Sequence, residues 1–333
     1  METTVIVDDA TGVAEARRAA AKMAEWVGLP DKLHGEVALV VSEAASNIVK
    51  YAQRGEILLR ATMYSGAVTS LEMLAVDKGP GIRNIDEAMR DGHSTGGSLG
   101  AGLGTMKRRA SFFDLYSLPE RGTAVLAQFS AGRTESTTLP GFVVGARATP
   151  RAGQDMCGDA WAVSLRGDAL WVTILDGLGH GPLAHQASNQ GLDYFRGPAV
   201  FDTPEALAQQ LHAALKGTRG AVVGLAKIAP KERLLRFTGI GNILAGVFTA
   251  RTATRLLSTD GTVGYMMQRV RPTQADWNAK SVYIASTDGL STRWTLNGHP
   301  DLLEHHPSLI AAVLHRDFAR DTDDATVVVV KEA

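Results

Sequence analysis

The stretch GHSTGGSLGAGLGTMKRR, residues 92–109, decides how the first part of this chain folds. Six glycines lie between Gly92 and Gly104, too many for a helix and without the alternation of a strand. A loop of this kind can wrap its backbone N–H groups around phosphate oxygens. A helix is expected to begin near Gly104, with its positive end toward the loop. Lys107 and Arg108 either add charge to a phosphate site or are simply solvated.

An acid and an amide precede this loop in SEAASNIVKYA, residues 42–52. Glu43 and Asn47 are four residues apart, so in a helix they share one face. A carboxylate beside an amide could position a nucleophile and a magnesium ion. The same spacing also fits a solvated helix face.

A second motif, VDKGPGI at residues 76–82, places an aspartate at the end of an apolar strand. Asp77 could accept a hydrogen bond from the exocyclic amine of adenine, while Gly79 and Gly81 allow close approach. Asp-Gly sequences are equally common in ordinary turns.

Taken in this order, the three motifs and the RGT of residues 121–123 resemble the GHKL ATPases, and most closely the anti-sigma-factor serine kinases of the RsbT type. The resemblance implies that Glu43 is the general base and that Asn47 binds ATP and ligates Mg²⁺. It also implies a small STAS-domain protein as phosphate acceptor. The remaining ATP-binding residues that it implies are Asp77, Gly79, Gly81, Gly100, Gly102, Gly104 and Thr123.

Acidic residues recur at strand ends in the second part of the chain, in CGDAW (157–161), TILDGLGHG (173–181), IASTDGLS (284–291) and DDATVVVV (323–330). Strand ends at one edge of a sandwich can converge in space. Converging carboxylates repel each other unless a cation neutralises them, and oxygen ligands suit Mg²⁺ or Mn²⁺. A single Asp-Gly pair, however, is ordinary turn chemistry.

Together these spots resemble the metal-dependent type 2C protein phosphatases, in the branch of SpoIIE and RsbX. The resemblance implies a centre of two Mn²⁺ or Mg²⁺ ions with a bridging water that attacks phosphorus. It implies these ligands: Asp159, Asp176, the Gly177 carbonyl, Asp288 and Asp323. Asp323 is preferred over Asp324 because the first acid of the family's ending is usually the ligand.

The pattern of helices and strands predicts an α+β protein of two domains. Helical spacing at 13–28 and 33–52, followed by apolar strand-like runs, predicts a sandwich with helices on one face of a mixed sheet. Many short strands with three helices after residue 141 predict two stacked antiparallel sheets flanked by helices. We expect a GHKL domain at 1–131, a linker at 132–140 and a phosphatase domain at 141–333.

Length and composition agree with this division. The chain has 333 residues, about twice the usual domain length, with 45% apolar and 21% charged residues. Its net charge of −1 gives no overall field that favours nucleic acid or an anionic membrane as partner. The single cysteine, Cys157, the acidic start METTVIVDDA and the lack of a long apolar run predict a cytoplasmic protein.

Several other residues have side chains that could be catalytic or bind metal, but they also have ordinary structural explanations. His180 could be a general acid or part of a tight turn, and His305 and His306 are expected in a solvent-facing polar loop. The tryptophans after residue 141 are expected to pack in the core or at an edge rather than to form a binding cage; they are Trp161, Trp171, Trp277 and Trp294.

These observations predict a bifunctional regulator of a partner-switching or stressosome pathway. It is expected to phosphorylate and dephosphorylate STAS-domain proteins, and its kinase half is expected to bind a downstream regulator. The alternative is that the first domain is a nucleotide-dependent switch that only binds a STAS protein or a sigma factor, fused to an active phosphatase.

Overall fold

The computed structural model describes residues 1–64, 67–90, 102–131 and 139–333. The chain forms two compact units. The first contains residues 1–140 and 299–316, and the second contains residues 141–298 and 317–333. The second unit therefore differs from the predicted domain 141–333, because the segment 299–316 packs in the first unit. Residues 132–138 of the predicted linker lie outside the described residues.

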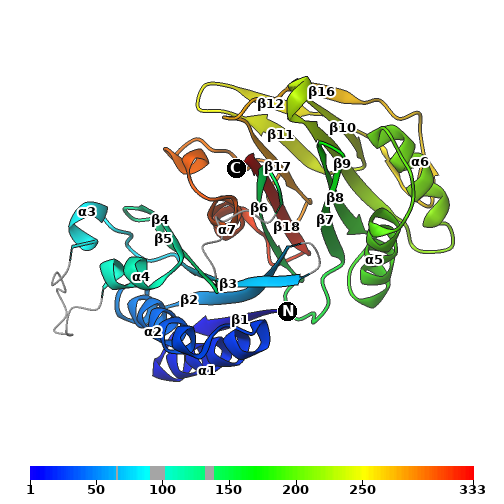
Figure 1. Ribbon diagram of the computed structural model, residues 1–333. Coiled ribbons are helices and arrows are strands. Elements are labelled where there is room, and N and C mark those ends of the chain that lie inside the picture. Colours follow the sequence, from blue (N-terminus) through cyan, green and yellow to red (C-terminus); the bar gives the residue numbers. More distant parts are fainter. Residues whose placement is uncertain (65–66, 91–101, 132–138) are drawn as a thin grey trace. The chain divides into compact units, whose positions relative to one another are not determined.

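The first unit is built on a five-stranded sheet of order β1-β2-β3-β5-β4 (Figure 1). Every pairing in it is antiparallel, so the predicted mixed sheet is wrong. The edge strand β1 was not predicted from the sequence, although its ETTVIV alternates in burial. The strands are β1 (Glu2–Val7), β2 (Gly55–Tyr64), β3 (Ala67–Asp77), β4 (Phe112–Leu118) and β5 (Gly122–Ser130).

Two long helices, α1 (Ala10–Val27) and α2 (Asp31–Asn47), cover one face of this sheet (Figure 1). The Asp9 side chain caps α1 by accepting from the Thr11 and Gly12 amides, and Gly28 ends it with φ +73°. Beyond Asn47 the helix continues as a π-helical turn, Ile48–Ala52. The short helices are α3 (Ile85–Ala88) and α4 (Leu103–Arg109).

The opposite face of the same sheet is also buried. Leu58, Leu74 and Leu126 stand in register on neighbouring strands and are at most 1% exposed. Residues from the segment 299–316, which contains helix α7 (Pro307–Phe318), contact this face through hydrogen bonds to β2, β3 and β4. The first unit thus has a sheet covered on both sides.

The second unit contains two sheets, drawn face to face in Figure 1. One has the order β13-β10-β9-β8-β7, with β16 beside β10, and carries α5 (Pro182–Arg196) and α6 (Pro204–Ala214). The other has the order β12-β11-β17-β18-β6. The strands are β6 (Phe142–Thr149), β7 (Asp159–Arg166), β8 (Ala169–Gly177), β9 (Ala221–Ala229), β10 (Leu234–Ile240), β11 (Leu244–Phe248), β12 (Ala253–Leu256), β13 (Ser258–Thr259), β16 (Thr273–Asp276), β17 (Val282–Ser286) and β18 (Ala325–Glu332), with a small hairpin of β14 (Gly261–Thr262) and β15 (Met266–Met267).

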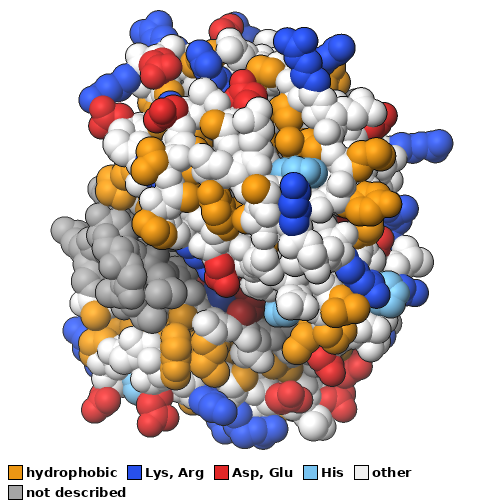
Figure 2. All heavy atoms as spheres, turned by 90° about the vertical axis from the view of Figure 1, so that its right-hand side faces the viewer, with side chains coloured by type: hydrophobic (Ala, Val, Ile, Leu, Met, Phe, Trp, Pro, Cys, Tyr) orange, Lys and Arg blue, Asp and Glu red, His pale blue; other side chains and the backbone are white. Residues whose placement is uncertain are grey.

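The core and surface follow the expected chemistry. Trp171, Trp277 and Trp294 are at most 2% exposed, as predicted. Acidic and basic side chains are interspersed on the face drawn in Figure 2, in keeping with a net charge of −1. Among the described residues, no helix is both long and apolar enough to cross a bilayer.

Candidate active sites

A cavity of about 570 Å³ opens beside α2 and the end of β3. Six residues predicted to act on the nucleotide line it: Glu43, Asn47, Asp77, Gly81, Gly102 and Thr123. Gly79 and Gly104 are not part of its lining, and Gly100 lies outside the described residues. The motifs that are separate in the sequence therefore meet around one space.

Asp77 is fixed by backbone amides. Its Oδ1 accepts from the Gly79 amide at 2.8 Å and from the Thr123 amide at 3.1 Å. Burial raises the pKa of Asp77, while these two hydrogen bonds and the nearby Arg316 act in the opposite direction. With Oδ1 engaged, Oδ2 accepts no hydrogen bond from the described residues, so it can take one from an amine in the cavity.

The turn after Asp77 requires glycine. Gly81 has φ +68°, and a Cβ there would lie 1.9 Å from the Leu118 carbonyl oxygen. At Gly79 a Cβ would lie 2.6 Å from that of Ala52. Gly79 thus acts through packing and its hydrogen bond to Asp77 rather than by lining the cavity.

Glu43 and Asn47 line the cavity from successive turns of α2. Partial burial raises the pKa of Glu43, and the positive charge of Lys50 offsets this in part. Lys50 and Tyr51 also line the cavity but were not singled out from the sequence. Lys50 lies three residues after Asn47, so helical spacing was the signal that could have found it.

The second site begins with two aspartates opposite each other in a strand pair. Asp159 starts β7, Asp176 lies near the end of β8, and the two are register partners. Thr287 donates to Asp159 Oδ2 at 2.7 Å, and Asn242 donates to Asp288 Oδ2 at 2.6 Å. Strand ends from both sheets therefore bring acidic residues together.

These carboxyl groups raise one another's pKa. Burial first, and then the negative charges of the neighbouring carboxylates, raise the pKa of Asp176. Burial and the Asp323 carboxylate likewise raise that of Asp288. The acidic residues that act on Asp176 are Asp159, Asp288, Asp323 and Asp324.

Asp324 is a site residue that the preference for Asp323 left out. It is 2% exposed, its Oδ1 accepts from the Arg151 amide at 2.9 Å, and its Oδ2 is buried without a hydrogen-bond partner. Asp323 instead accepts from the Asp324 amide. The signal was present in the sequence, because both acids precede the same buried strand.

The donor set of this site fits a divalent cation. Asp159 Oδ1 and Asp324 Oδ2 are buried and accept no hydrogen bond, and a cation would compensate both. Among the described residues, no group of three or more His, Cys, Asp or Glu side chains is already arranged to hold an ion. The buried, mutually repelling oxygens still favour a cation here, because ligands can close around an ion when it binds.

Glycines make room for these acids. A Cβ at Gly158 would lie 2.6 Å from Asp324 Oδ2, and one at Gly177 would lie 2.1 Å from the Ala184 carbonyl oxygen. The Gly177 amide donates to the Gly158 carbonyl, which ties together the segments that carry Asp159 and Asp176.

The histidines differ in exposure, and two of them are less exposed than predicted. His180 is exposed, whereas His185 Nδ1 lies 2.8 Å from the Cys157 carbonyl oxygen. His305 and His306 are not solvent-facing, so that prediction is wrong. His305 Nδ1 is 2.8 Å from Asp114 Oδ1, and the His306 amide donates to Asp114 Oδ2.

Comparison with known proteins places both units in families. Residues 6–129 match the histidine kinase-like ATPase domain, and residues 166–332, half of the chain, match stage II sporulation protein E (SpoIIE). The chain belongs to the SpoIIE family. The first unit of this SpoIIE-family chain is a kinase-like ATPase domain, so both resemblances and the predicted two-domain α+β fold are confirmed.

Two relatives come from Bacillus subtilis (strain 168). The serine/threonine-protein kinase RsbT is 36% identical over 115 residues, which cover 34% of this chain and 86% of RsbT. The phosphoserine phosphatase RsbX is 26% identical over 156 residues, which cover 46% of this chain and 74% of RsbX.

Two solved structures share the fold. The phosphatase domain of SpoIIE from Bacillus subtilis with a fragment of its regulatory domain has a TM-score of 0.50, 14% identity and 97% coverage of both chains. The second comes from work on the bacterial stressosome, described as a modular system adapted to control secondary messenger signalling. Its TM-score is 0.53 at 24% identity, and the match covers 57% of this chain and 99% of that chain.

Proposed function

We propose that this chain both adds and removes a phosphoryl group on a partner-switching protein. The ATPase unit transfers phosphate from ATP to a Ser or Thr of a STAS-domain protein, and the SpoIIE-type unit removes it from the same or a related protein. The observation that carries this proposal is that one chain holds an acid–amide pair in its nucleotide cavity and a separate cluster of five buried or half-buried aspartates. RsbT and RsbX, each similar to one unit, are named as a kinase and a phosphatase.

In the kinase step, Glu43 takes the proton from the attacking hydroxyl. Burial raises its pKa, which makes its carboxylate a better proton acceptor than an exposed one. The Asn47 side-chain oxygen would hold Mg²⁺, which neutralises charge on the phosphates. Asp77 Oδ2 accepts a hydrogen bond from the adenine amine, while its Oδ1 accepts from the Gly79 and Thr123 amides.

In the phosphatase step, two Mg²⁺ or Mn²⁺ ions would be held by Asp159, Asp176, the Gly177 carbonyl, Asp288 and the Asp323–Asp324 pair, in which Asp324 Oδ2 is the buried oxygen without a hydrogen-bond partner. Such ions supply an activated water and polarise the phosphoryl group. Thr287 fixes the orientation of Asp159 and Asn242 that of Asp288. These hydrogen bonds keep one oxygen of each aspartate engaged and leave the other for a ligand role.

Joining the two activities in one chain raises the local concentration of each near a shared substrate. A cytoplasmic location, where ATP is available, is part of this proposal, as is a downstream regulator bound by the ATPase unit.

The test uses the full chain with a STAS-domain protein from the same genome. ATP and Mg²⁺ are added, phosphate on the STAS protein is followed by mass, and Mn²⁺ is added after ATP is removed. Glu43→Ala is expected to slow transfer by about 10²–10⁴-fold, and Asp176→Asn is expected to leave phosphate in place. Glu25→Ala and Asp168→Asn, at exposed acids of the two units, are the matched controls.

If no phosphate is transferred while nucleotide still changes partner binding, the ATPase unit is a switch and the kinase proposal fails. If phosphate is transferred but Mn²⁺ never removes it, the phosphatase proposal fails on this substrate.

A further inference from the structure

Large apolar side chains are exposed around the metal-centre end of the second unit. A single exposed apolar residue is normal on a protein surface, whereas a group of them marks a contact site. Several lie in loops or turns beside the strand ends that carry Asp159 and Asp176. They are Met156, Leu178, Leu183, Tyr265 and Met266.

The hairpin of β14 and β15 extends the sheet beside Gly177. Ala221 of β9 is the register partner of Gly177 in β8, and it also forms a β-bridge with Val263. The Ala221 amide donates to the Val263 carbonyl at 3.0 Å, and the Val263 amide donates to the Ala221 carbonyl at 2.8 Å. Val263 is fully buried, so the hairpin has a fixed base while Tyr265 is 80% and Met266 61% exposed.

Gly220 brings this hairpin against the loop that follows Gly177. Its φ is +81°, and a Cβ there would lie 2.6 Å from the Val263 carbonyl oxygen, so the close approach of the two backbones requires glycine. The Gly220 carbonyl accepts from the Leu178 amide at 3.0 Å. Leu178 and the hairpin therefore flank one residue, immediately next to the proposed metal ligand Gly177.

A positively charged side chain lies in the same place. Arg219 precedes Gly220, and its Nη1 lies 2.9 Å from where a Cβ on Gly179 would be. Arg219 is exposed and forms no hydrogen bond or ion pair with any residue that the structure describes. Gly179 is three residues after Asp176, so this charge lies beside the loop that leaves the metal centre. We call this arginine, together with Leu178, Tyr265 and Met266, the rim patch.

The charges around the metal centre favour a phosphorylated ligand at the rim patch. Five carboxylates exceed the charge of two divalent cations, so an incoming phosphoryl dianion meets net negative charge unless another cation is near. Arg219 supplies such a cation, and a guanidinium can hold a phosphoryl group through two hydrogen bonds. The apolar side chains cannot stabilise a phosphoryl group, so they are suited to the residues on either side of it.

We propose that the rim patch binds the polypeptide on either side of a phosphoserine or phosphothreonine. Apolar side chains of the substrate pack on Leu178, Tyr265 and Met266, and Arg219 binds the phosphoryl group as it enters the metal centre. This inference rests on the proposed phosphatase function and adds its substrate class, a phosphoprotein with apolar residues next to the modified side chain.

The test uses the full chain, Mn²⁺ and two phosphoserine peptides that differ only in the residues flanking phosphoserine, which are leucine in one and serine in the other. Phosphate release is measured, and p-nitrophenyl phosphate serves as a small substrate without flanking residues. We expect kcat/KM to be at least about fivefold higher for the leucine peptide. Tyr265→Ser and Met266→Ser are each expected to reduce this preference, with p-nitrophenyl phosphate as the reference for folding and metal loading.

The arginine is tested separately. Arg219→Gln is expected to raise KM about tenfold for both peptides and for p-nitrophenyl phosphate, because all three share the phosphoryl group. Arg219→Lys, which keeps the charge, is expected to recover part of this loss. Val200→Ser is the matched control, because Val200 is 79% exposed between α5 and α6, and it should keep the full preference for leucine.

The rim patch is overturned as a substrate surface if the wild-type chain hydrolyses p-nitrophenyl phosphate but treats both peptides alike, or if Tyr265→Ser and Met266→Ser both keep the preference. It is also overturned if these substitutions change only the oligomeric state in size-exclusion chromatography, which would make the patch a contact between copies of the chain. An unchanged KM in Arg219→Gln would contradict its contact with phosphate. Failure to hydrolyse p-nitrophenyl phosphate at any Mn²⁺ concentration would overturn the metal centre itself, and the rim patch with it.

Discussion

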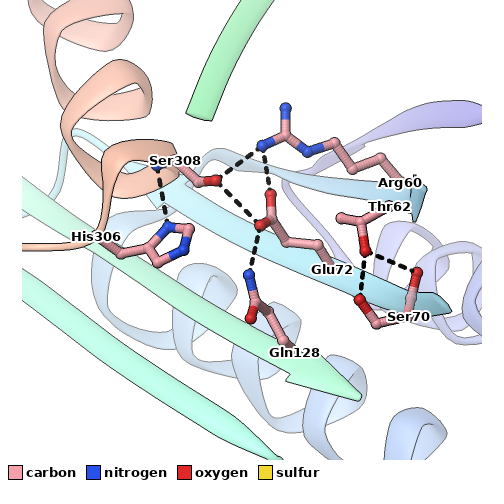
Figure 3. A network of polar contacts seen from close by, with 7 residues as sticks. All are labelled: Arg60, Thr62, Ser70, Glu72, Gln128, His306 and Ser308. Atoms are coloured by element: carbon pink, nitrogen blue, oxygen red, sulfur yellow. Dashed lines mark hydrogen bonds and ion pairs between the residues drawn. The ribbon is translucent and has the colours of Figure 1, made fainter. Parts of the chain in front are cut away.

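Removal of the Glu72 carboxylate is expected to destabilise the ATPase unit by about 3 kcal/mol. Glu72 is 1% exposed, and its partner Arg60 has a side chain that is 12% exposed. Glu72→Ala removes the carboxylate that contacts the Arg60 guanidinium, while Arg60 keeps its hydrogen bond to Ser308 (Figure 3). Removing one member of a buried ion pair costs about 3–5 kcal/mol.

The lower end of that range applies here for a geometric reason. Glu72 Oε1 is in ionic contact with Arg60 but accepts no well-aligned hydrogen bond, and Arg60 keeps its bond to Ser308. Burial tends to raise the pKa of Glu72, but the charges of Arg60 and His306 and the hydrogen bonds from Gln128 and Ser308 outweigh it, so its pKa is lowered. The carboxylate is therefore charged, and its pairing is stabilising, at neutral pH.

The assay is hydrogen exchange of peptides from β2 and β3 in the full-length protein, because a chain of two units need not unfold in a single transition. The matched control is Asp168→Ala, which breaks a 2.7 Å ion pair with Lys231 in which the side chains are 72% and 78% exposed. Peptides of β7 and β8 in that variant should lose at most about 1 kcal/mol of protection. If Glu72→Ala costs no more than this control, the reasoning from burial is wrong.

Three further predictions concern the two sites. Gly81→Ala should weaken binding of an ATP analogue at least about tenfold, as measured by calorimetry. The turn must move because Gly81 has φ +68° and the new Cβ would lie 1.9 Å from the Leu118 carbonyl oxygen. The control Gly35→Ala, whose Cβ would meet nothing within 4 Å, should bind the analogue normally. In EDTA, the melting temperature of the second unit should fall as pH rises from the ordinary aspartate range toward about 9. Burial and the neighbouring carboxylates raise the pKa of Asp176 to about 9. A raised folded-state pKa gives stability that is present at low pH and lost as the group ionises. A flat profile in scanning calorimetry would contradict the burial of like charges. Adding Mn²⁺ at pH 8 should raise that melting temperature, and Asp176→Asn should both flatten the EDTA profile and reduce the gain from Mn²⁺, which the same scans test.

The sequence by itself identified the two families and predicted the residues of both candidate sites. Glu43, Asn47 and Asp77 could be found because helical spacing and a strand-end Asp-Gly turn are local patterns. The acidic positions could be found because each lies at or beside a strand end, but the sequence did not show that Asp324 is the more deeply buried acid of the Asp323–Asp324 pair. The edge strand β1 was missed because six residues with one exposed face carry a weak signal, and the antiparallel sheet was missed because composition does not fix strand pairing.

Only the tertiary structure decided which unit holds the segment 299–316. Its sequence predicts a late helix of the second domain, and the pair His305 and His306 predicts a polar, solvent-facing loop. The docking depends on Glu72, Asp114 and Asp77, which lie about 190 to 240 residues earlier in the chain. Contacts over such separations form only when strand register places alternate side chains on one face, and no local pattern in the sequence records that register.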